Sequence, residues 1–272
     1  MKNVKKTIVY LLLAVGAVIM VFPFVWMILS SLKTAAEVNT TPPTFFPGSP
    51  TFENYRYAFE KAPFLTYFLN SVAVTVACVV CTQFTTILAA FAFSRLKFPG
   101  RDLLFSLLLS MMMIPFEMLI ITNYQTIVNW HLIDNLLALI IPFTSSIFYT
   151  YILRNFFLSI PDSLYYSARV DGASNWRYLW RIMVPMAKPA LVTTALLNAI
   201  TCWNSFLWTV LVTNNPESRT LPFGLYAFMT SSGIRYERLM AAATIVVIPM
   251  IILFICFRKN IVTGVSRGGL KG

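Results

Sequence analysis

Six long apolar runs constrain the fold of this 272-residue chain more than any other feature of its sequence. An α-helix needs about 20 apolar residues to cross the hydrocarbon core of a bilayer. The runs cover residues 7–32, 70–93, 103–121, 136–157, 189–212 and 239–257. Charged residues make up only 11% of the chain, whereas about 25% is typical of a soluble domain. The runs do not alternate with polar residues as barrel strands do. The sequence therefore predicts an all-α polytopic membrane protein with six transmembrane helices.

The distribution of Lys and Arg predicts the orientation of these helices. Cytoplasmic connections of membrane proteins carry an excess of Lys and Arg. If the N-terminus is cytoplasmic, 15 of the 21 Lys and Arg residues fall in cytoplasmic segments, and the net charge of +11 is mostly a cytoplasmic excess. We therefore expect a multi-pass protein of the cytoplasmic membrane with both termini in the cytoplasm. The basic composition needs no nucleic acid partner to explain it.

Two outer loops are rich in residues that interrupt regular structure. Residues 33–67 contain several prolines, and residues 213–238 contain Pro216 and Pro222. Because proline lacks a backbone donor and interrupts helices, we expect irregular outer caps. These caps serve either as plain connections or as a docking surface for an extracytoplasmic partner. The expected regions are the first helix with its outer loop over residues 1–66, a membrane core over residues 67–260, and a cytoplasmic tail over residues 261–272.

The cysteines do not form a pattern typical of a metal or redox site. Cys78, Cys81, Cys202 and Cys256 all lie inside apolar runs. Cys78 and Cys81 form a C-x-x-C, but without the loop-to-helix setting of a redox motif or further zinc ligands. His131 also has no visible ligand partners. We expect the cysteines to be small packing residues and predict no metal site.

A polar inner loop over residues 159–188 carries the signals of two short helices. Pro161 is tolerated in the first turn of a helix. Asp171 and Gly172 end that helix, because glycine readily adopts the left-handed conformation found at helix ends. Ser174 can cap a second helix. The sequence therefore predicts a sharp bend at Gly172, with the first helix projecting into the cytoplasm.

The second short helix is predicted to be amphipathic and interfacial. Its apolar residues recur at helical spacing, and its arginines lie on another face, as in helices that lie in a membrane surface. The apolar positions are Trp176, Leu179, Trp180 and Met183, and the arginines are Arg177 and Arg181.

The same loop resembles the cytoplasmic signature of the permease subunits of bacterial ATP-binding cassette (ABC) importers. That signature reads E-A-A, three residues, G, nine residues, I-x-L-P, and its spacing is kept here. The matching residues are Ala168, Gly172, Ile182 and Pro185, and the departures are Tyr166, Ser167 and Val184. The departures fall at the glutamate, the first alanine and the leucine of the signature. The bend does not depend on them.

Further stretches extend the resemblance over most of the chain to the six-helix permeases of carbohydrate importers, such as the maltose and glycerol-phosphate systems. They are SLKTAAEV after the first helix, PTFENYRYAF in the outer loop, TCWNSFLW in the fifth helix, TLPFGL in the last outer loop and GVSRGGLKG at the C-terminus. The resemblance implies the type I ABC importer permease fold in a bacterial cytoplasmic membrane.

What the resemblance implies is a channel-forming importer subunit that translocates a sugar or oligosaccharide and is not an enzyme. The inner loop would be the coupling helix that docks on a cytoplasmic ATPase dimer. The residues assigned to it are Ser167, Ala168, Asp171, Gly172, Ala173, Ile182 and Pro185. ATP and magnesium are expected on that ATPase and no cofactor on this chain, which has no G-x-x-x-x-G-K-[ST] phosphate loop. A second permease, forming a heterodimer, and an extracytoplasmic solute-binding protein are implied as partners.

The fifth apolar run holds the candidate substrate-path residues. They are Asn198, Thr201, Trp203, Asn204, Ser205 and Trp208. They combine hydrogen-bonding groups with flat apolar faces, which suits sugars. Polar side chains in membrane helices also hold neighbouring helices together, so helix packing is the alternative role for each of them. We hypothesise that Asn204 lines the path.

Two other features bear on the class of protein. Thr75, Thr82 and Thr86 share a face of the second helix, with Gln83 adjacent, and are expected to pack the bundle. Glu117 is the only acid well inside an apolar run, and it is either a proton-relay group or a solvated, capped acid. An ion-coupled secondary transporter is the alternative function, but it would be expected to show two similar halves and several intramembrane acids. A membrane enzyme would need a convergent catalytic set, which the loops do not offer.

Overall fold

The computed structural model describes the backbone of residues 2–230 and 233–268, and the side chains of residues 6–229 and 235–256. The chain divides into two compact units. Unit 1 comprises Met1–Leu65 and Leu221–Ile251, and unit 2 comprises Thr66–Thr220 and Ile252–Gly272. The C-terminal stretch GVSRGGLKG, on which part of the resemblance rests, lies outside the residues with described side chains.

Unit 1 contains the outer loop that the sequence predicts to be irregular. Its elements are α1 (Lys2–Ser31), α2 (Ala35–Val38), α3 (Glu53–Lys61), the 3-10 segment η4 (Leu221–Phe228), the strands β1 (Met229–Thr230) and β2 (Gly233–Ile234), and the start of α14 (Tyr236–Gly268). The strands pair antiparallel as a two-residue hairpin, which the all-α prediction did not include.

Side chains hold the outer loop of unit 1 in place. Glu37 closes a capping box with Thr34 and also accepts hydrogen bonds from the backbone N–H groups of Gly48 and Ser49, at 3.0 and 3.1 Å. These bonds to the charged form lower the pKa of Glu37 below its usual value, with the Thr34 N–H as the largest cause. Asn54 is buried and donates to the carbonyls of Ser31, the last residue of α1, and Lys33. The loop is therefore an ordered cap despite its prolines.

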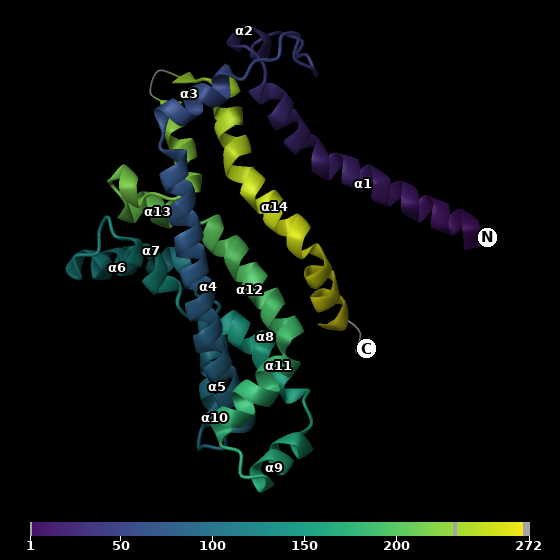
Figure 1. Cartoon of the computed structure of the whole chain (residues 1–272), viewed down its shortest axis with the longest axis vertical. Coiled ribbons are helices and arrows are strands. Elements are labelled where there is room, and N and C mark those ends of the chain that lie inside the picture. The colour runs from purple at the N-terminus through teal and green to yellow at the C-terminus, as the bar shows by residue number, and fades with distance from the viewer. Residues whose placement is uncertain (1, 231–232, 269–272) are drawn as a thin grey trace. The chain divides into compact units, whose positions relative to one another are not determined.

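Unit 2 is an assembly of helices that includes most of α4 (Figure 1). Its elements are α4 (Phe64–Arg95), α5 (Arg101–Met111), α6 (Phe116–Asn129), α7 (Leu136–Ile140), the 3-10 segment η1 (Ile141–Phe143), α8 (Ile147–Leu158), α9 (Asp162–Val170), α10 (Asn175–Tyr178), the π-helical segment η2 (Leu179–Met183), α11 (Val184–Met186), α12 (Lys188–Trp203), α13 (Leu207–Val212) and the 3-10 segment η3 (Pro216–Ser218).

The apolar runs appear as three long helices and three bent pairs among the described residues. Lys6–Ser31, Phe64–Arg95 and Tyr236–Cys256 are each long and apolar enough to cross a membrane. The bent pairs are α5 with α6 at 94°, α7 and η1 with α8 at 45°, and the Asn175–Met186 segment with α12 at 79°. If each pair is one span, the total is six, and the predicted all-α polytopic fold is confirmed.

Three of the predicted spans are broken rather than continuous. The run at residues 136–157 breaks between Phe143 and Ile147. The run at residues 103–121 breaks between Met111 and Phe116, because Pro115 lacks the backbone donor that a continuous helix needs. The run at residues 189–212 breaks between Trp203 and Leu207, where Asn204 and Ser205 interrupt the helix. Asparagine and serine compete with helical backbone bonds, which explains why the break falls there.

Two buried apolar clusters organise unit 2. One joins α4 and α8 to α9, α10 and η2, through residues such as Phe91, Phe157 and Tyr178. The other joins α4 and α6 to α7 and α13, through residues such as Ile127 and Trp208. In Figure 1 the elements α9 and α10 lie at one end of unit 2, while α6, α7 and α13 lie toward its other end. Each cluster supports one of the two candidate sites.

Candidate functional site

The bend predicted in the inner loop is present. Helix α9 ends at Val170, and Gly172 adopts a left-handed conformation with φ of +78°. The Ala173 N–H donates to the Ala168 carbonyl at 2.9 Å, and the Gly172 N–H donates to the Arg169 carbonyl at 3.1 Å. These two bonds form a Schellman motif, which satisfies carbonyls left open at a helix end. The Ser174 hydroxyl then caps α10 by accepting from the Arg177 N–H at 3.2 Å.

The residues assigned to the coupling loop divide between buried and exposed positions. Ala168 and Ala173 are buried in the first apolar cluster, against which Ile182 also packs. The others, Ser167, Asp171, Gly172 and Pro185, are exposed. The small residues of the motif are therefore required where the loop packs on α4 and α8, because a larger side chain would not fit there.

The apolar face of the second short helix differs from the prediction. Leu179 and Met183 are buried, Trp176 is exposed, and Tyr178, which the predicted face omits, is fully buried. The π-helical turn of η2 explains the difference. Its hydrogen bonds join residues five apart rather than four, so the 3.6-residue spacing used for the prediction does not hold.

Two arginines hold the helix ends beside this loop together. Arg95, at the end of α4, pairs with Asp162 at the start of α9 and donates to the carbonyls of Phe157 and Ile160 at 2.7 and 2.5 Å. Arg154 on α8 donates in the opposite direction, to the Phe93 carbonyl of α4 at 3.1 Å. We call these two side chains the arginine pair. They satisfy carbonyls at the ends of both helices, which otherwise lack partners within the helix.

Apolar side chains are exposed on the short helices of this loop. The exposed large apolar side chains of α9 and the start of α10 are Leu164, Tyr166, Val170 and Trp176. Val170 is 87% exposed although it directly precedes the bend. Sequence reasoning named only the motif positions and missed Leu164 and Val170 as surface residues. For Val170 the signal was available, since it is two residues from the buried Ala168 and lies on another side of the helix, whereas Leu164 lies four residues before Ala168 on the same side.

A cavity lies at the other candidate site, where α12 breaks into α13. It has a volume of about 470 Å³ and is lined by residues of α4, α6, α7, η1, α12 and α13 together with Thr220. Five of the six predicted path residues line it: Asn198, Thr201, Asn204, Ser205 and Trp208. Trp203 does not; it is buried and packs edge-to-face against Phe68.

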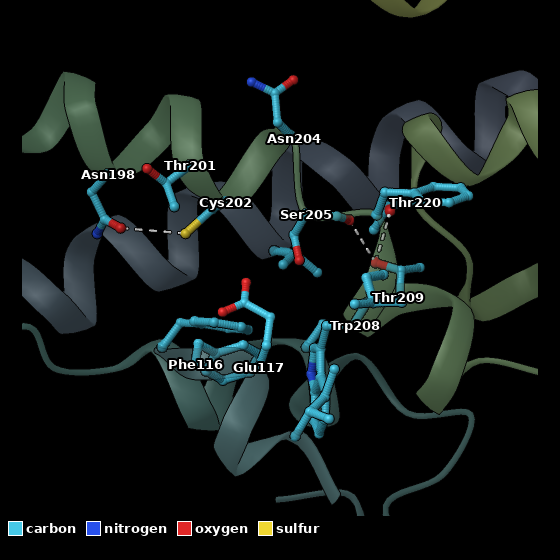
Figure 2. A pocket seen from close by; sticks show the side chains of 16 residues that line it. Phe116, Glu117, Asn198, Thr201, Cys202, Asn204, Ser205, Trp208, Thr209 and Thr220 are labelled. Carbon is cyan, nitrogen blue, oxygen red and sulfur yellow. Dashed lines mark hydrogen bonds between the residues drawn. The ribbon is translucent and has the colours of Figure 1, made fainter. Parts of the chain in front are cut away.

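The path residues differ in how free their polar groups are. Asn198 donates to the Cys78 carbonyl at 3.5 Å, and the Trp208 indole donates to the Ala138 carbonyl at 2.9 Å, so both also hold helices together. Ser205 points into the cavity, whereas the amide of Asn204 points away from it in Figure 2. Asn204 therefore contributes to the cavity at its edge.

Glu117 enters this cavity from the opposite side. It follows Pro115 in the first turn of α6, and Figure 2 shows its carboxylate and the Ser205 hydroxyl pointing toward one another. The sequence places the two residues far apart, in different apolar runs. The sequence-based interpretation as a solvated acid agrees with its exposed side chain.

Two residues of the polar row of α4, Thr82 and Gln83, bond to neighbouring elements. Thr82 donates to the Phe143 carbonyl at 2.6 Å, and Gln83 donates to the Thr194 hydroxyl at 2.9 Å. Cys78 is buried in the second apolar cluster. Within the residues that the structure describes, no group of three or more His, Cys, Asp or Glu side chains is placed to hold a metal ion.

A polytopic helix assembly with an anchored, bent polar loop and a polar and aromatic cavity at a helix break is typical of a membrane transport subunit. The chain matches the protein family described as "Binding-protein-dependent transport system inner membrane component" over residues 84–267, and it belongs to that family. The predictions of a multi-pass inner membrane protein and of a carbohydrate-type ABC importer permease are confirmed.

The similarity to relatives and to solved structures covers nearly the whole chain. The arabinooligosaccharides transport system permease protein of Halalkalibacterium halodurans is 32% identical over 279 residues, covering 100% of both chains. A diacetylchitobiose uptake system permease protein of Streptomyces coelicolor is 31% identical, covering 96% of this chain and 87% of the relative. The crystal structure of a bacterial ABC transporter that imports the acidic polysaccharide alginate matches with a TM-score of 0.81 and 26% identity, over 94% of this chain and 96% of that one.

Proposed function

We propose that this chain forms one half of the path through which a sugar or oligosaccharide enters the cell, driven by ATP hydrolysis on a separate cytoplasmic ATPase dimer. Relatives named for arabinooligosaccharides and diacetylchitobiose support a carbohydrate cargo. The cavity supports it too, because it combines aromatic faces with amide and hydroxyl groups. The match to a family of transport components favours this function over an ion-coupled secondary transporter.

The anchored inner loop is the observation that carries the proposal. Helix α9 exposes Val170, Tyr166 and Leu164 while the arginine pair holds its base against α4 and α8. Exposed apolar side chains on a rigid support are typical of a protein interface. In our proposal the ATPase covers these exposed side chains, and the buried anchors transmit its movement to α4 and α8. Residues 159–188 are the coupling loop in this scheme.

The remaining partners follow from the same scheme. A second, different permease completes the path, and an extracytoplasmic solute-binding protein delivers the cargo to the outer loops. ATP and magnesium bind on the ATPase, and both termini of this chain lie in the cytoplasm. Residues 1–66 supply the first helix and outer loop, residues 67–260 the membrane core, and residues 261–272 a cytoplasmic tail. The family's dependence on a binding protein supports this arrangement.

The proposal is tested by purifying the tagged chain from its native membrane in mild detergent and identifying its partners by mass spectrometry. We expect an ATPase and a second permease with the unmodified chain. The Val170→Asp variant should lose the ATPase and keep the second permease, because a charge would be desolvated in the apolar interface.

A matched variant controls for general damage by a new charge. Leu158 is also exposed and apolar but lies at the end of α8, outside α9. The Leu158→Asp variant should retain the ATPase. An unmodified chain that purifies alone, or a Val170→Asp variant that keeps its ATPase, would contradict the proposed coupling surface.

A further inference from the structure

Glu117 is the feature of the cavity that the transport function does not yet explain. Its carboxylate points into the cavity and makes no hydrogen bond or ion pair with any residue that the structure describes. The cavity lining contains no Lys, Arg or His to neutralise it. An acid in the first helical turn is favoured by the helix dipole, but that does not require it to face a cavity.

The surroundings of Glu117 are mostly apolar. Phe116, Phe143 and Trp208 supply aromatic surface, and the Ser205 hydroxyl points toward Glu117 from the other side of the cavity. A charge acts over a longer distance beside apolar walls than in bulk water, because the effective dielectric constant is lower. Glu117 is the one charged residue of this lining, so its carboxylate gives the cavity a negative charge.

A carboxylate also suits one class of sugar. Its two oxygens accept hydrogen bonds from neighbouring hydroxyl groups or from an ammonium group, but they have no donor for a uronate, phosphate or sulfonate. The similar proteins leave the charge of the cargo open, since their names include neutral diacetylchitobiose and the acidic polysaccharide alginate. The charge of the cavity is thus the feature that distinguishes these cargoes.

We infer that Glu117 is a charge filter in the cavity, which accepts neutral and amino sugars through their hydroxyl and ammonium groups and repels anionic sugars. The inference rests on the proposed function, in which this cavity is part of the translocation path. It assigns Glu117 a role in substrate specificity and no role in moving protons.

The local charge is measured with a cysteine reporter in the cavity. The four native cysteines are replaced, Ser205→Cys is introduced, and the transporter complex is placed in lipid nanodiscs, so that both faces are open to solution. Thiol labelling is then timed with a cationic trimethylammonium and an anionic sulfonate methanethiosulfonate reagent. Each rate is divided by the rate of the same reagent with a free thiol. Thr201→Cys, at another position in the cavity lining, is a second reporter if the first variant fails to fold.

We expect the cationic reagent to react about tenfold faster than the anionic one, because attraction of one and repulsion of the other each contribute about threefold. The Glu117→Gln variant should bring this ratio close to one. Glu217→Gln is the matched control, since Glu217 is an exposed acid of the same unit that does not line the cavity. The ratio should stay near ten in that control. A ratio that Glu117→Gln does not change would overturn the charge filter.

Protection of the reporter by sugars separates this inference from the proposed function. Diacetylchitobiose, its deacetylated amine form and digalacturonate are added before labelling with a neutral methanethiosulfonate reagent. We expect protection by the first two sugars only, and protection by digalacturonate to appear in Glu117→Gln. If the ratio of labelling rates behaves as expected but no sugar protects the reporter with or without Glu117→Gln, the path proposal fails while the negative potential stands. If digalacturonate protects the reporter equally with and without Glu117→Gln, the charge filter is contradicted while the path proposal stands.

Discussion

Replacing Arg95 tests whether the arginine pair anchors the inner loop. The Arg95 side chain is only 4% exposed, and it donates to two backbone carbonyls near the junction of α8 and α9. A hydrogen bond to a charged group contributes about 1.5–3 kcal/mol, so the loss of two bonds costs about 3 kcal/mol at the lower figure. The Arg95→Ala variant should therefore lower the free energy of local opening of α9 by about 3 kcal/mol.

The assay is amide hydrogen exchange of the purified complex, read by mass spectrometry over α9. Each 1.4 kcal/mol is a tenfold change, so exchange of these amides should become about 150-fold faster. Asp162→Asn is the matched control. The Asp162 side chain is 71% exposed, and such partly solvated ion pairs contribute at most about 1 kcal/mol, or about fivefold in exchange.

Two results would refute this reasoning. One is exchange of α9 in Arg95→Ala within about twofold of the unmodified chain. The other is an effect of Asp162→Asn as large as that of Arg95→Ala, which would assign the anchor to the ion pair instead of the carbonyls. Arg95→Lys should fall between the two variants, because a lysine ammonium lacks the planar fork that reaches two carbonyls at once.

Three further predictions concern substitutions at single positions. Gly172→Ala and Gly100→Ala should each lower the free energy of unfolding by about 1 kcal/mol, because both glycines have φ near +75° while a Cβ would meet nothing within 4 Å. In purification, Gly172→Trp should lose the ATPase, whereas Gly100→Trp should keep it. Gly224→Ala should lower the unfolding temperature by several degrees, because its Cβ would lie 2.6 Å from the ring of Phe64 and overpacking costs about 1–3 kcal/mol. The pKa of Glu37 is lower in the folded chain than in the unfolded chain, so its hydrogen bonds stabilise the outer loop above the unfolded pKa. This stabilisation is lost as the pH falls through the folded pKa, and limited proteolysis of the loop should therefore increase at acid pH. In Glu37→Gln that pH dependence should disappear, and unchanged cleavage across the pH range in the unmodified chain would contradict the role of Glu37.

Local signals were sufficient to predict the inner loop. The left-handed Gly172 and the cap at Ser174 depend on the backbone preferences of a few neighbouring residues, which can be seen in the sequence. The six apolar runs likewise follow from the thickness of a membrane. The position of the helix breaks was harder to predict. Pro115 and Asn204 are visible, but a membrane helix often tolerates such residues, so the sequence did not show that the chain turns there.

The composition of the two sites depends on contacts between distant parts of the chain. Trp203 and Trp208 are equal candidates in the sequence, yet only Trp208 lines the cavity, because the break between them reorients the chain. Glu117 and Ser205 come to line one cavity only after α6 and the end of α12 have packed around the second cluster. Arg95 likewise looks like one more cytoplasmic charge until the carbonyls of α8 are placed beside it. Secondary structure and membrane insertion are thus determined by local composition, whereas the cavity and its charge arise from tertiary packing, since side-chain direction across helices is not encoded in local spacing.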